Sequence, residues 1–473
     1  MAFHAVPSLK RKMFSQFGFV SAFSLGRGGR NLTAFPSRQK CGTRRHQHVK
    51  AVLRPNIAVV GGGHGGISVA LRLMTLPWTR LTKPTVTLID RKDRFTFLPM
   101  LYELALGQVE RWEVAPKFTD LLADSSIKFV QGNVENLDLA SGAVEGTLMG
   151  EKGSPEFRVP FDRLVLALGV QPGGIDKVPG AKEYAIPFYG LQDAFSLKER
   201  IASLRKNSSP SKVVNIVVVG GSFCGVELAS CLAEDFGSAA SVMVVEPSDR
   251  LLAQGTDFNR RISEKSLVAN GAVTLYRSRV AEITKDKVVI EKLDGGTANI
   301  VRYPSDLVLW TAGTEASSAL PNFDVPLGER GLIATDSLLQ VKEHENRIFA
   351  LGDSASVDIE SKYNGTAQVA VQQAEYAAWN TWASLMGKPK LQYRYAHLGE
   401  MMVLGAKNAT VTTSVGLELD GGAAWAARRL AYLARMPTDR HRARVAASWA
   451  ANPLLSGMGD LVKESRKYRT NNI

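Results

Sequence analysis

The chain has 473 residues, 45% of them hydrophobic, which is enough for two or three domains with a sizeable core and excludes disorder over most of its length. The net charge of +13 is uneven: residues 1–53 carry ten Lys and Arg and no acid, residues 386–473 carry 14 basic and 6 acidic residues, and residues 54–385 carry 34 basic and 39 acidic residues. A slightly acidic centre argues against a nucleic-acid groove, so no nucleic-acid partner is expected, whereas the basic ends favour a cleavable leader and a membrane-facing surface.

The cysteines and histidines exclude two classes of site. Cys41, Cys224 and Cys231 form no C-x-x-C pair and no plausible disulfide framework, which indicates a reducing compartment. The seven histidines show no zinc-ligand spacing with them, so no metal site is expected. No apolar run approaches the ~18–20 residues that a spanning helix needs, so the sequence predicts no integral membrane segment.

Residues 1–53 are rich in Arg, Ser, Phe and Gly. We interpret them as an organelle transit peptide, with a retained basic arm as the alternative. The composition is typical of both plastid and mitochondrial leaders.

A first dinucleotide-binding motif follows the leader. The β-branched run at residues 57–60 leads into glycines at positions 61, 63 and 66, and an Ala- and Leu-rich helical segment comes next. Gly61 allows the tight turn, Gly63 lets the backbone approach a pyrophosphate, and Gly66 lets the helix pack closely on the strand. The following apolar run ends at Asp90, a carboxylate that can bind a pair of ribose hydroxyls.

Residues 94–107 mix aromatic residues with a proline and a glycine, a pattern too irregular for one helix. We expect a loop against a flat aromatic cofactor, with plain core packing as the alternative. Strands are expected at residues 127–130 and 159–167, and the second ends in a turn at Gly169.

The motif then returns in a second unit. Residues 215–219 lead into Gly220 and Gly225, and a second strand ends at Glu246. Ser222 stands where the second glycine of the motif belongs and adds a Cβ atom on the pyrophosphate path. Serine is the smallest such addition, so we expect nucleotide binding to survive with lower affinity. The Glu246 carboxylate would bind a 2′-hydroxyl and repel a 2′-phosphate, which favours NADH over NADPH.

Two later strands end in glycine turns, one at Gly313 and one at Gly352, and Asp353 then stands where a helix can begin. Two dinucleotide units in one chain, with the first resumed after the second, predict a flavoprotein that binds FAD in one unit and a nicotinamide donor in the other. Further on, Gln368 and Gln372 share one helix face, where their amides can bind a quinone oxygen or form a polar surface.

The tail contains an imperfectly amphipathic helix at residues 422–436. On a helical wheel Trp425, Tyr432, Leu433 and Met436 share a side, Arg428 and Arg435 lie opposite, and Arg429 falls inside the apolar arc. This composition is typical of helices that lie on a bilayer, and a homodimer interface is the alternative.

At this point the sequence resembles the type II NAD(P)H:quinone oxidoreductases. The resemblance rests on residues 61–66, 94–107, 220–227, 351–353 and 367–373, and the tail at residues 398–405 and 426–439 resembles the plant and algal C-type branch of chloroplast plastoglobules. It implies bound FAD, NADH or NADPH as donor, and a membrane prenylquinone as acceptor: plastoquinone, demethylphylloquinone or ubiquinone. The C-type branch is associated with NADPH, in tension with Glu246.

The resemblance also implies the roles of individual residues. Glu227 would lie beside the nicotinamide, and Gln368 and Gln372 would lie near the quinone headgroup. The residues expected to bind the nucleotides are Gly61, Gly63, Gly66, Asp90, Gly220, Gly225, Glu246, Gly313, Gly352 and Asp353. Relatives usually place prolines at residues 362–365, where this chain has Lys-Tyr-Asn-Gly.

The sequence thus predicts an α/β protein with two Rossmann-like dinucleotide-binding domains, as in the disulfide reductases, and a helical, membrane-associating C-terminal region. The expected divisions are a transit peptide at 1–53, an FAD domain at 54–190 and 305–385, an NAD(P)H domain at 191–304, and the C-terminal region at 386–473. A plastid location at the plastoglobule or thylakoid surface is expected, with the mitochondrial inner membrane as the alternative. Pyridine-nucleotide disulfide reductases and sulfide:quinone oxidoreductases need a cysteine beside the flavin, and residues 54–170 have none. A ferredoxin reductase or a flavin-bearing signalling protein of the same fold remains the competing interpretation.

Overall fold

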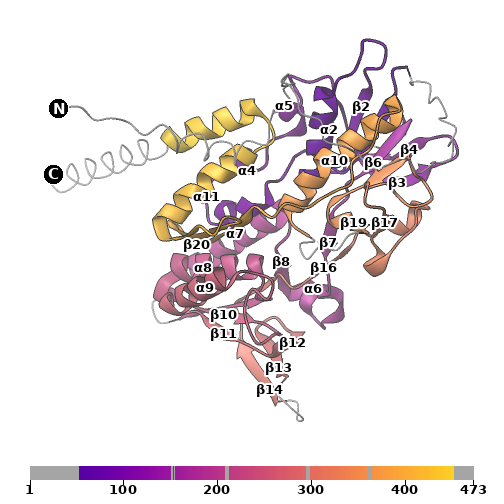
Figure 1. The fold of residues 1–473 in the computed structure, drawn as a ribbon. Helices are drawn as coiled ribbons and strands as arrows, with labels where there is room; N and C mark the ends of the chain where they lie inside the picture. The colour runs from indigo at the N-terminus through magenta and orange to yellow at the C-terminus, as the bar shows by residue number, and fades with distance from the viewer. Residues whose placement is uncertain are drawn as a thin grey trace, which may run out of the picture. The chain divides into compact units, whose positions relative to one another are not determined.

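The computed structural model describes residues 53–150, 153, 155–207, 212–293, 299–358 and 365–451 (Figure 1). The predicted transit peptide, apart from Leu53, lies outside the described residues, as do residues 362–364 and the end of the tail.

A seven-stranded sheet forms the first unit, in the order β18-β6-β1-β2-β3-β4-β5. Its parallel strands are β1 (Asn56–Val60), β2 (Thr85–Asp90), β3 (Lys128–Asp138), β6 (Arg163–Leu166) and β18 (Ile348–Ala350), and β4 (Ala143–Leu148) and β5 (Glu156–Pro160) continue it as an antiparallel meander. Strand β18 returns to this sheet after the whole second unit. The single strand expected at 159–167 is wrong, because the chain turns after Pro160 and β6 begins at Arg163.

A five-stranded parallel sheet forms the second unit, in the order β11-β10-β9-β15-β8. Its strands are β8 (Ala185–Pro187), β9 (Val214–Val219), β10 (Ala240–Val245), β11 (Val273–Leu275) and β15 (Leu307–Trp310). Because β8 and β15 belong to this sheet, it extends beyond both ends of the expected domain at 191–304. The part β3-β2-β1-β6-β18 of the first sheet has the same order around its central strand.

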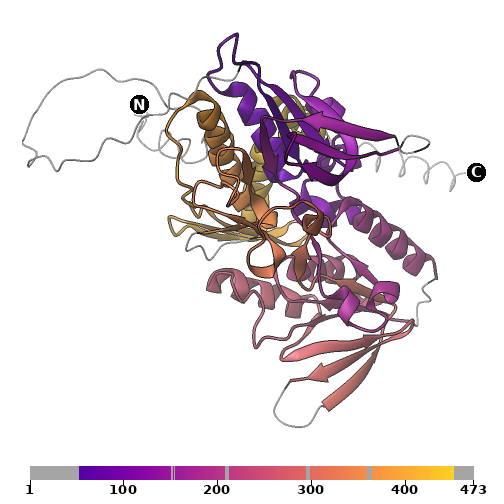
Figure 2. The same ribbon diagram turned by 90° about the vertical axis from the view of Figure 1, so that its right-hand side faces the viewer.

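Smaller sheets complete both units. The antiparallel meander β12 (Ser278–Ile283), β13 (Lys287–Lys292) and β14 (Asn299–Pro304) extends from the second unit (Figure 2). The pairs β7 (Val170–Pro172) with β16 (Thr314–Ala316), and β17 (Ile333–Thr335) with β19 (Ala355–Val357), are two-stranded. The chain passes from the first unit to the second near β7 and returns near β16, so the first pair holds these two connecting segments together.

Helices cover the sheets because their apolar faces match the buried strands. In the first unit α2 (His64–Thr75) packs along α10 (Ala367–Met386), and in the second α8 (Phe223–Phe236) packs against α9 (Asp257–Ala269) and β10. The other helices of four or more residues before α11 are α3 (Leu101–Ala105), α4 (Arg111–Val114), α5 (Phe118–Leu121), α6 (Ala181–Tyr184) and α7 (Leu191–Asn207). Of these, α3 packs on both α7 and α8, so it lies at the contact between the units.

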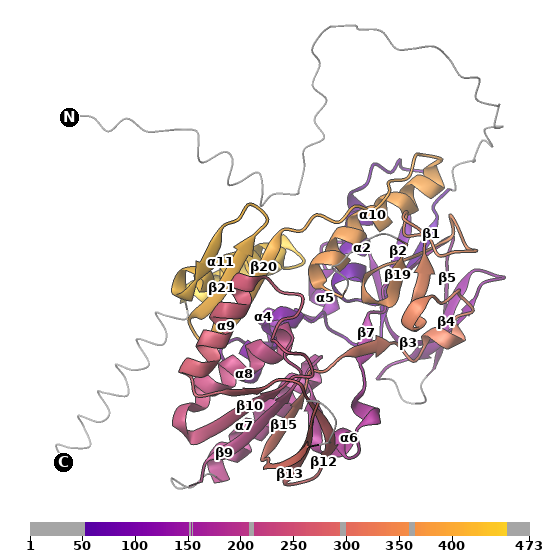
Figure 3. The same ribbon diagram turned by 60° about the horizontal axis from the view of Figure 1, so that its bottom comes forward.

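The C-terminal region contains the expected helices and also a sheet that the sequence analysis did not predict. It begins with a sheet of β20 (Gly399–Gly405), β21 (Asn408–Thr413) and β22 (Glu418–Asp420), followed by α11 (Gly421–Arg435) and by helical residues 439–451. Strand β20 packs on α8, and β21 contacts α9 and α11 (Figure 3). No helix within residues 53–451, as far as these are described, is long and apolar enough to cross a bilayer.

Candidate active site at the junction of two nucleotide-binding units

The first glycine turn (Gly61–Gly66) has the geometry of a nucleotide cradle. Gly61 has φ +98°, a left-handed conformation that favours glycine. A Cβ atom on Gly66 would lie 1.7 Å from the carbonyl oxygen of Gly61, so only glycine fits there. A Cβ atom on Gly63 would meet nothing within 4 Å, which leaves open space over the turn at the N-terminus of α2.

Asp90 closes this turn from the end of β2. Its carboxylate accepts hydrogen bonds from the backbone N–H of Gly62 at 2.6 Å and of Lys92 at 2.8 Å. The carboxylate is therefore fixed beside the turn, where the ribose of a bound dinucleotide would lie.

The second glycine turn (Gly220–Gly225) repeats this geometry. Gly220 has φ +105°, and a Cβ atom on Gly225 would lie 1.9 Å from the carbonyl oxygen of Gly220. Glu246 accepts from the N–H of Gly221 at 2.7 Å and of Ser248 at 2.9 Å.

Ser222 takes the same extended conformation as its counterpart Gly63, with φ −80° against −68°. It is exposed at the N-terminus of α8 and its side chain caps no backbone N–H there. The residue therefore fits the turn without backbone strain, and its extra atoms only narrow the space above it.

The other expected glycines follow two further strands, β15 beside the central strand of the second sheet and β18 at the edge of the first. Gly313 follows β15 with φ +80°, and Gly352 follows β18 with φ +70°. The N–H of Gly352 donates to the side-chain oxygen of Gln373 at 2.7 Å, a positioning contact that the sequence analysis missed. Asp353 comes next, and burial raises the pKa of its carboxyl group.

Residues 94–107 pack mainly as core. Phe95 and Phe97 are buried, and their ring centroids lie 5.1 and 5.5 Å from the ring of His64. Burial lowers the pKa of His64 to about 4, so its ring is neutral at the first glycine turn. The segment then forms a short 3₁₀ turn (Leu98–Met100) and α3, which directs Tyr102 towards the second unit.

Glu227, on the second turn of α8, lies at the junction of the two units. Its Oε1 atom accepts from the hydroxyl group of Tyr102 at 3.3 Å and from the N–H of Val403 in β20 at 3.0 Å. Burial raises its pKa to about 7, although Arg428 and these two hydrogen bonds oppose the rise. A carboxyl group with this pKa can give and take a proton at neutral pH.

A buried charged cluster adjoins this carboxyl group, and sequence reasoning missed it. Arg428 of α11 donates to Glu103 at 2.8 Å, to the carbonyl oxygen of Pro99 at 2.9 Å and to the Tyr102 hydroxyl. Glu103 also pairs with Arg429 at 2.9 Å.

The buried and exposed faces of α11 differ from those that the helical wheel predicted. Arg428 was expected on the polar face but is completely buried, whereas Leu430 is 68% exposed. Arg429, expected to reach out of the apolar arc, instead packs over the rings of Trp425 and Trp449 at 5.1 and 4.4 Å. The wheel failed because partners on α3, distant in sequence, decide which arginine is buried.

Gln368 and Gln372 lie on one face of α10, as expected, but their amides bind the chain. Gln368 accepts from the Tyr395 hydroxyl at 2.8 Å and from Leu398 N–H at 3.0 Å, and it donates to the carbonyl oxygen of Gly399 at 3.3 Å. Gln372 exchanges two hydrogen bonds with the backbone of Ala396, at 2.7 and 2.9 Å. Each side-chain amide carries two N–H groups, and contacts among the described residues use one on each glutamine.

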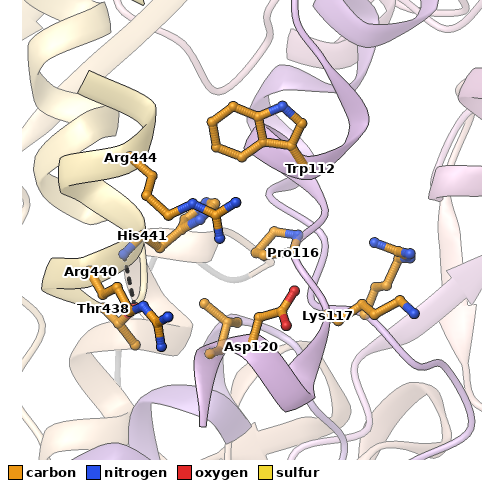
Figure 4. Close-up of a pocket in the computed structure, with 10 residues that line it drawn as sticks. Trp112, Pro116, Lys117, Asp120, Thr438, Arg440, His441 and Arg444 are labelled. Carbon is orange, nitrogen blue, oxygen red and sulfur yellow. Dashed lines mark hydrogen bonds between the residues drawn. The ribbon is translucent and has the colours of Figure 1, made fainter. Parts of the chain in front are cut away.

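A pocket lies away from the glycine turns, between the α4–α5 segment and the C-terminal helical residues (Figure 4). His441 donates from Nε2 to the carbonyl oxygen of Glu113 at 2.8 Å, and the Arg444 guanidinium lies 5.2 Å from the Trp112 ring. These contacts attach residues 439–451 to the first unit, and Arg440 and Lys117 make the pocket basic.

Comparison with known proteins agrees with this geometry. The pattern of the pyridine nucleotide-disulphide oxidoreductase family matches residues 55–374. The chain is 39% identical to demethylphylloquinone reductase NdbB of Synechocystis sp. over 87% of this chain and 98% of that protein. It is 40% identical to alternative NAD(P)H-ubiquinone oxidoreductase C1, chloroplastic/mitochondrial, of Arabidopsis thaliana, over 84% of this chain and 81% of that one.

Among solved structures, NDH2 of Plasmodium falciparum in complex with NADH superposes with a TM-score of 0.72 at 16% identity. The match covers 85% of this chain and 98% of that one, and it shows a shared fold. The glycine turns, their acids and the open space at Gly63 fit FAD and a nicotinamide nucleotide. The chain therefore belongs to the pyridine nucleotide-disulphide oxidoreductase family and, within it, to the FAD-dependent type II NAD(P)H:quinone oxidoreductases.

Proposed function

We propose that this protein oxidises NADH or NADPH and reduces a membrane prenylquinone, without pumping protons. The observation that carries the proposal is the junction at Glu227, where a carboxyl group of the second unit hydrogen-bonds Tyr102 of the first, 3.3 Å away. This contact brings the two units together, and holding a donor and an acceptor site close to each other is what electron transfer from a nicotinamide to a quinone needs.

The two units have separate binding roles in this proposal. In the first, Gly61, Gly63 and Gly66 receive the FAD pyrophosphate, and Asp90 binds its ribose. Asp353, after Gly352, takes a hydroxyl group of the ribityl chain. The bound flavin supplies two-electron chemistry with hydride acceptance from the donor.

In the second unit, Gly220, Gly225 and Gly313 receive NADH or NADPH. Two backbone N–H groups hold the Glu246 carboxylate at the turn. There it binds the ribose hydroxyls and favours NADH, because it would repel a 2′-phosphate.

The overall reaction consumes NAD(P)H, one proton and a quinone, and it gives NAD(P)⁺ and a quinol. The hydride brings both electrons and one of the two hydrogens that the quinone needs. Glu227 gives the second as a proton to the reduced quinone oxygen and recovers it from water, since its pKa lies at about 7. Gln368 and Gln372 hold the headgroup with the N–H group that each keeps beyond its chain partners.

We propose that the C-terminal helices rest on a bilayer surface. The outward face of α11 carries exposed Ala426, Leu430 and Ala434, and Arg440 and Arg444 are exposed on the helix that follows. Apolar residues flanked by arginines suit an anionic membrane. The opposite face of α11 touches Tyr102, so a quinone leaving the bilayer reaches the junction by a short path.

The relatives suggest the quinone and the compartment. One is named a demethylphylloquinone reductase and the other carries a chloroplastic/mitochondrial location. Together with the acid-free leader, they support a plastid location, at the plastoglobule or thylakoid surface, and demethylphylloquinone or plastoquinone as the acceptor.

The test is a matrix of two donors against several quinones on purified protein with its flavin identified. We expect FAD, bleaching by NADH, and turnover with demethylphylloquinone and plastoquinone analogues. Protein without flavin, or flavin that neither donor bleaches, would refute the proposal.

Membrane association needs its own measurement, sedimentation with vesicles of anionic or neutral lipid. Leu430→Asp should lower binding to anionic vesicles at least tenfold while flavin content stays the same. Unchanged binding together with loss of a dimer would instead assign this face to a second copy of the chain.

A further inference from the structure

We propose that Arg428, on the C-terminal helix α11, is a positioning residue for Glu227 that acts through the Tyr102 hydroxyl group. This inference rests on the proposed function, because Glu227 is the proton donor there. It connects the region expected to meet the membrane with the reacting centre.

The contacts of the guanidinium group carry the argument. Arg428 is completely buried, its Nη1 atom binds Glu103 at 2.8 Å, and its Nη2 atom binds both the Pro99 carbonyl oxygen and the Tyr102 hydroxyl. The ion pair with Glu103 alone would neutralise the buried positive charge of Arg428. The second amino group of the guanidinium, Nη2, also fixes the Tyr102 hydroxyl group, which hydrogen-bonds Glu227.

The Tyr102 hydroxyl passes this restraint on to Glu227. A phenol has one hydrogen to donate, and its oxygen accepts from Arg428. The hydrogen is therefore free to point at Glu227 Oε1, 3.3 Å away. The N–H of Val403 binds the same oxygen at 3.0 Å, so both of these hydrogen bonds hold the Oε1 side of the carboxyl group.

The titratable groups around Glu227 shift its pKa in both directions. Those that face it are Tyr102 and Glu103 on α3, Arg428 and Tyr432 on α11, and Cys224 and Cys231 on its own helix. Arg428 is the cation among them, and Glu103 partly offsets it. Arg428 and the Tyr102 hydrogen bond favour the carboxylate, whereas burial favours the acid, so the contact poises the group between its two states.

The neighbouring Arg429 provides a matched control. It pairs with the other oxygen of Glu103 at 2.9 Å, from the adjacent position on the same helix. Its remaining contacts are with Trp425 and Trp449, and no contact with Tyr102 is recorded for it among the described residues. Changing Arg429 tests the packing of α11 and the pairing of Glu103 without touching the Tyr102 hydroxyl.

The experiment uses the flavin-loaded full chain and two readouts. The first is the infrared carboxyl band of Glu227 against pH, identified by its loss in Glu227→Gln. The second is the pH profile of quinone reduction by enzyme already reduced with NADH.

For Tyr102→Phe we expect both midpoints to rise by about one pH unit, a tenfold change in the ionisation constant, because the carboxylate loses a donor. Arg428→Lys should shift them the same way, since an ammonium group cannot reach Glu103 and Tyr102 as a fork. Arg429→Lys should leave them in place, and flavin bleaching by NADH should be unchanged in Tyr102→Phe.

A Glu227 band that titrates at the same pH in the parent protein, Tyr102→Phe and Arg428→Lys overturns the inference. Equal shifts in Arg429→Lys and Arg428→Lys also overturn it, because they would indicate a general packing effect. If an Arg428 variant fails to fold, Tyr102→Phe still decides. Absence of quinone reduction in the parent protein would refute the proposed function, whereas the infrared titration would still report on Arg428.

Discussion

The two glycine turns have nearly the same backbone geometry, and the residues around them differ. In both, a glycine with φ near +100° follows the central strand, and the third glycine touches the first. Asp90 and Glu246 both bind the turn and the residue two positions beyond themselves. Backbone geometry of this kind is set by local sterics, so the duplicated motif gives duplicated structure.

The differences lie around the turns. In the first unit the outer strand β18 is followed by Leu351, Gly352 and Asp353, whereas in the second the corresponding strand β8 is followed by Phe188, Tyr189 and Gly190. At this position the first unit therefore has an acid, Asp353, that could bind a second part of a long ligand, and the second unit has none. We infer that the first binds its nucleotide throughout the cycle and the second releases it each turnover.

The largest expected effect comes from a methyl group at the third glycine. In Gly66→Ala the Cβ atom would lie 1.7 Å from the Gly61 oxygen, and in Gly225→Ala 1.9 Å from the Gly220 oxygen. Overpacking of this kind costs about 1–3 kcal/mol or more. Gly66→Ala should purify without flavin, whereas Gly225→Ala should keep flavin and lose at least ~100-fold in bleaching by NADH. Gly63→Ala, whose Cβ atom meets nothing in the chain, should fold normally and keep more flavin than Gly66→Ala. Flavin retained normally in Gly66→Ala would contradict the comparison.

A pH-dependent difference should come from His64, whose counterpart in the second turn is Phe223. The folded pKa of His64 is about 4, below the usual 6.5, so on acidification the unfolded chain binds the proton first. Stability is full above pH 6.5 and falls as the pH drops towards 4, by about 3 kcal/mol at most. His64→Phe should flatten this part of the profile, measured as thermal melting and flavin release. An unchanged slope would show that His64 is not the group responsible.

An intermediate effect is expected at the two acids. Glu246→Gln should raise kcat/KM for NADPH relative to NADH by about tenfold, because a repulsion against the 2′-phosphate is removed. Asp90→Asn should weaken flavin retention and leave the donor preference unchanged. Steady-state rates with both donors, beside the flavin to protein ratio, check this, and a change of donor preference in Asp90→Asn would reverse the roles of the units.

The smallest effect is expected from Ser222. Its φ of −80° needs no glycine and its side chain is exposed, so Ser222→Gly should lower KM for NADH by no more than about threefold. Gly63→Ser, the reciprocal change, should weaken FAD binding to a similar degree. A tenfold change in either would mean that the serine controls nucleotide exchange.

Several features of this protein were predictable from sequence for a local reason. A glycine turn after a β-branched run and before a helix requires only nearby residues, so both cradles, their acids and the return of the first unit could be predicted. The short strands β8 and β15 could not be assigned to the second sheet, because three or four residues carry little pattern and their partners are far along the chain.

The site itself depended on contacts between distant residues. Gln368 and Gln372 share the expected face, but residues 395–399 occupy much of their amide capacity. Arg428 looked like a solvent-facing arginine, yet it is buried by Glu103 and Tyr102 more than 320 positions earlier. Sequence alone determined the two glycine turns that we propose as nucleotide sites, because turn geometry is local. Only the tertiary structure decided which charges meet at Glu227, because burial and pairing are properties of the packed chain.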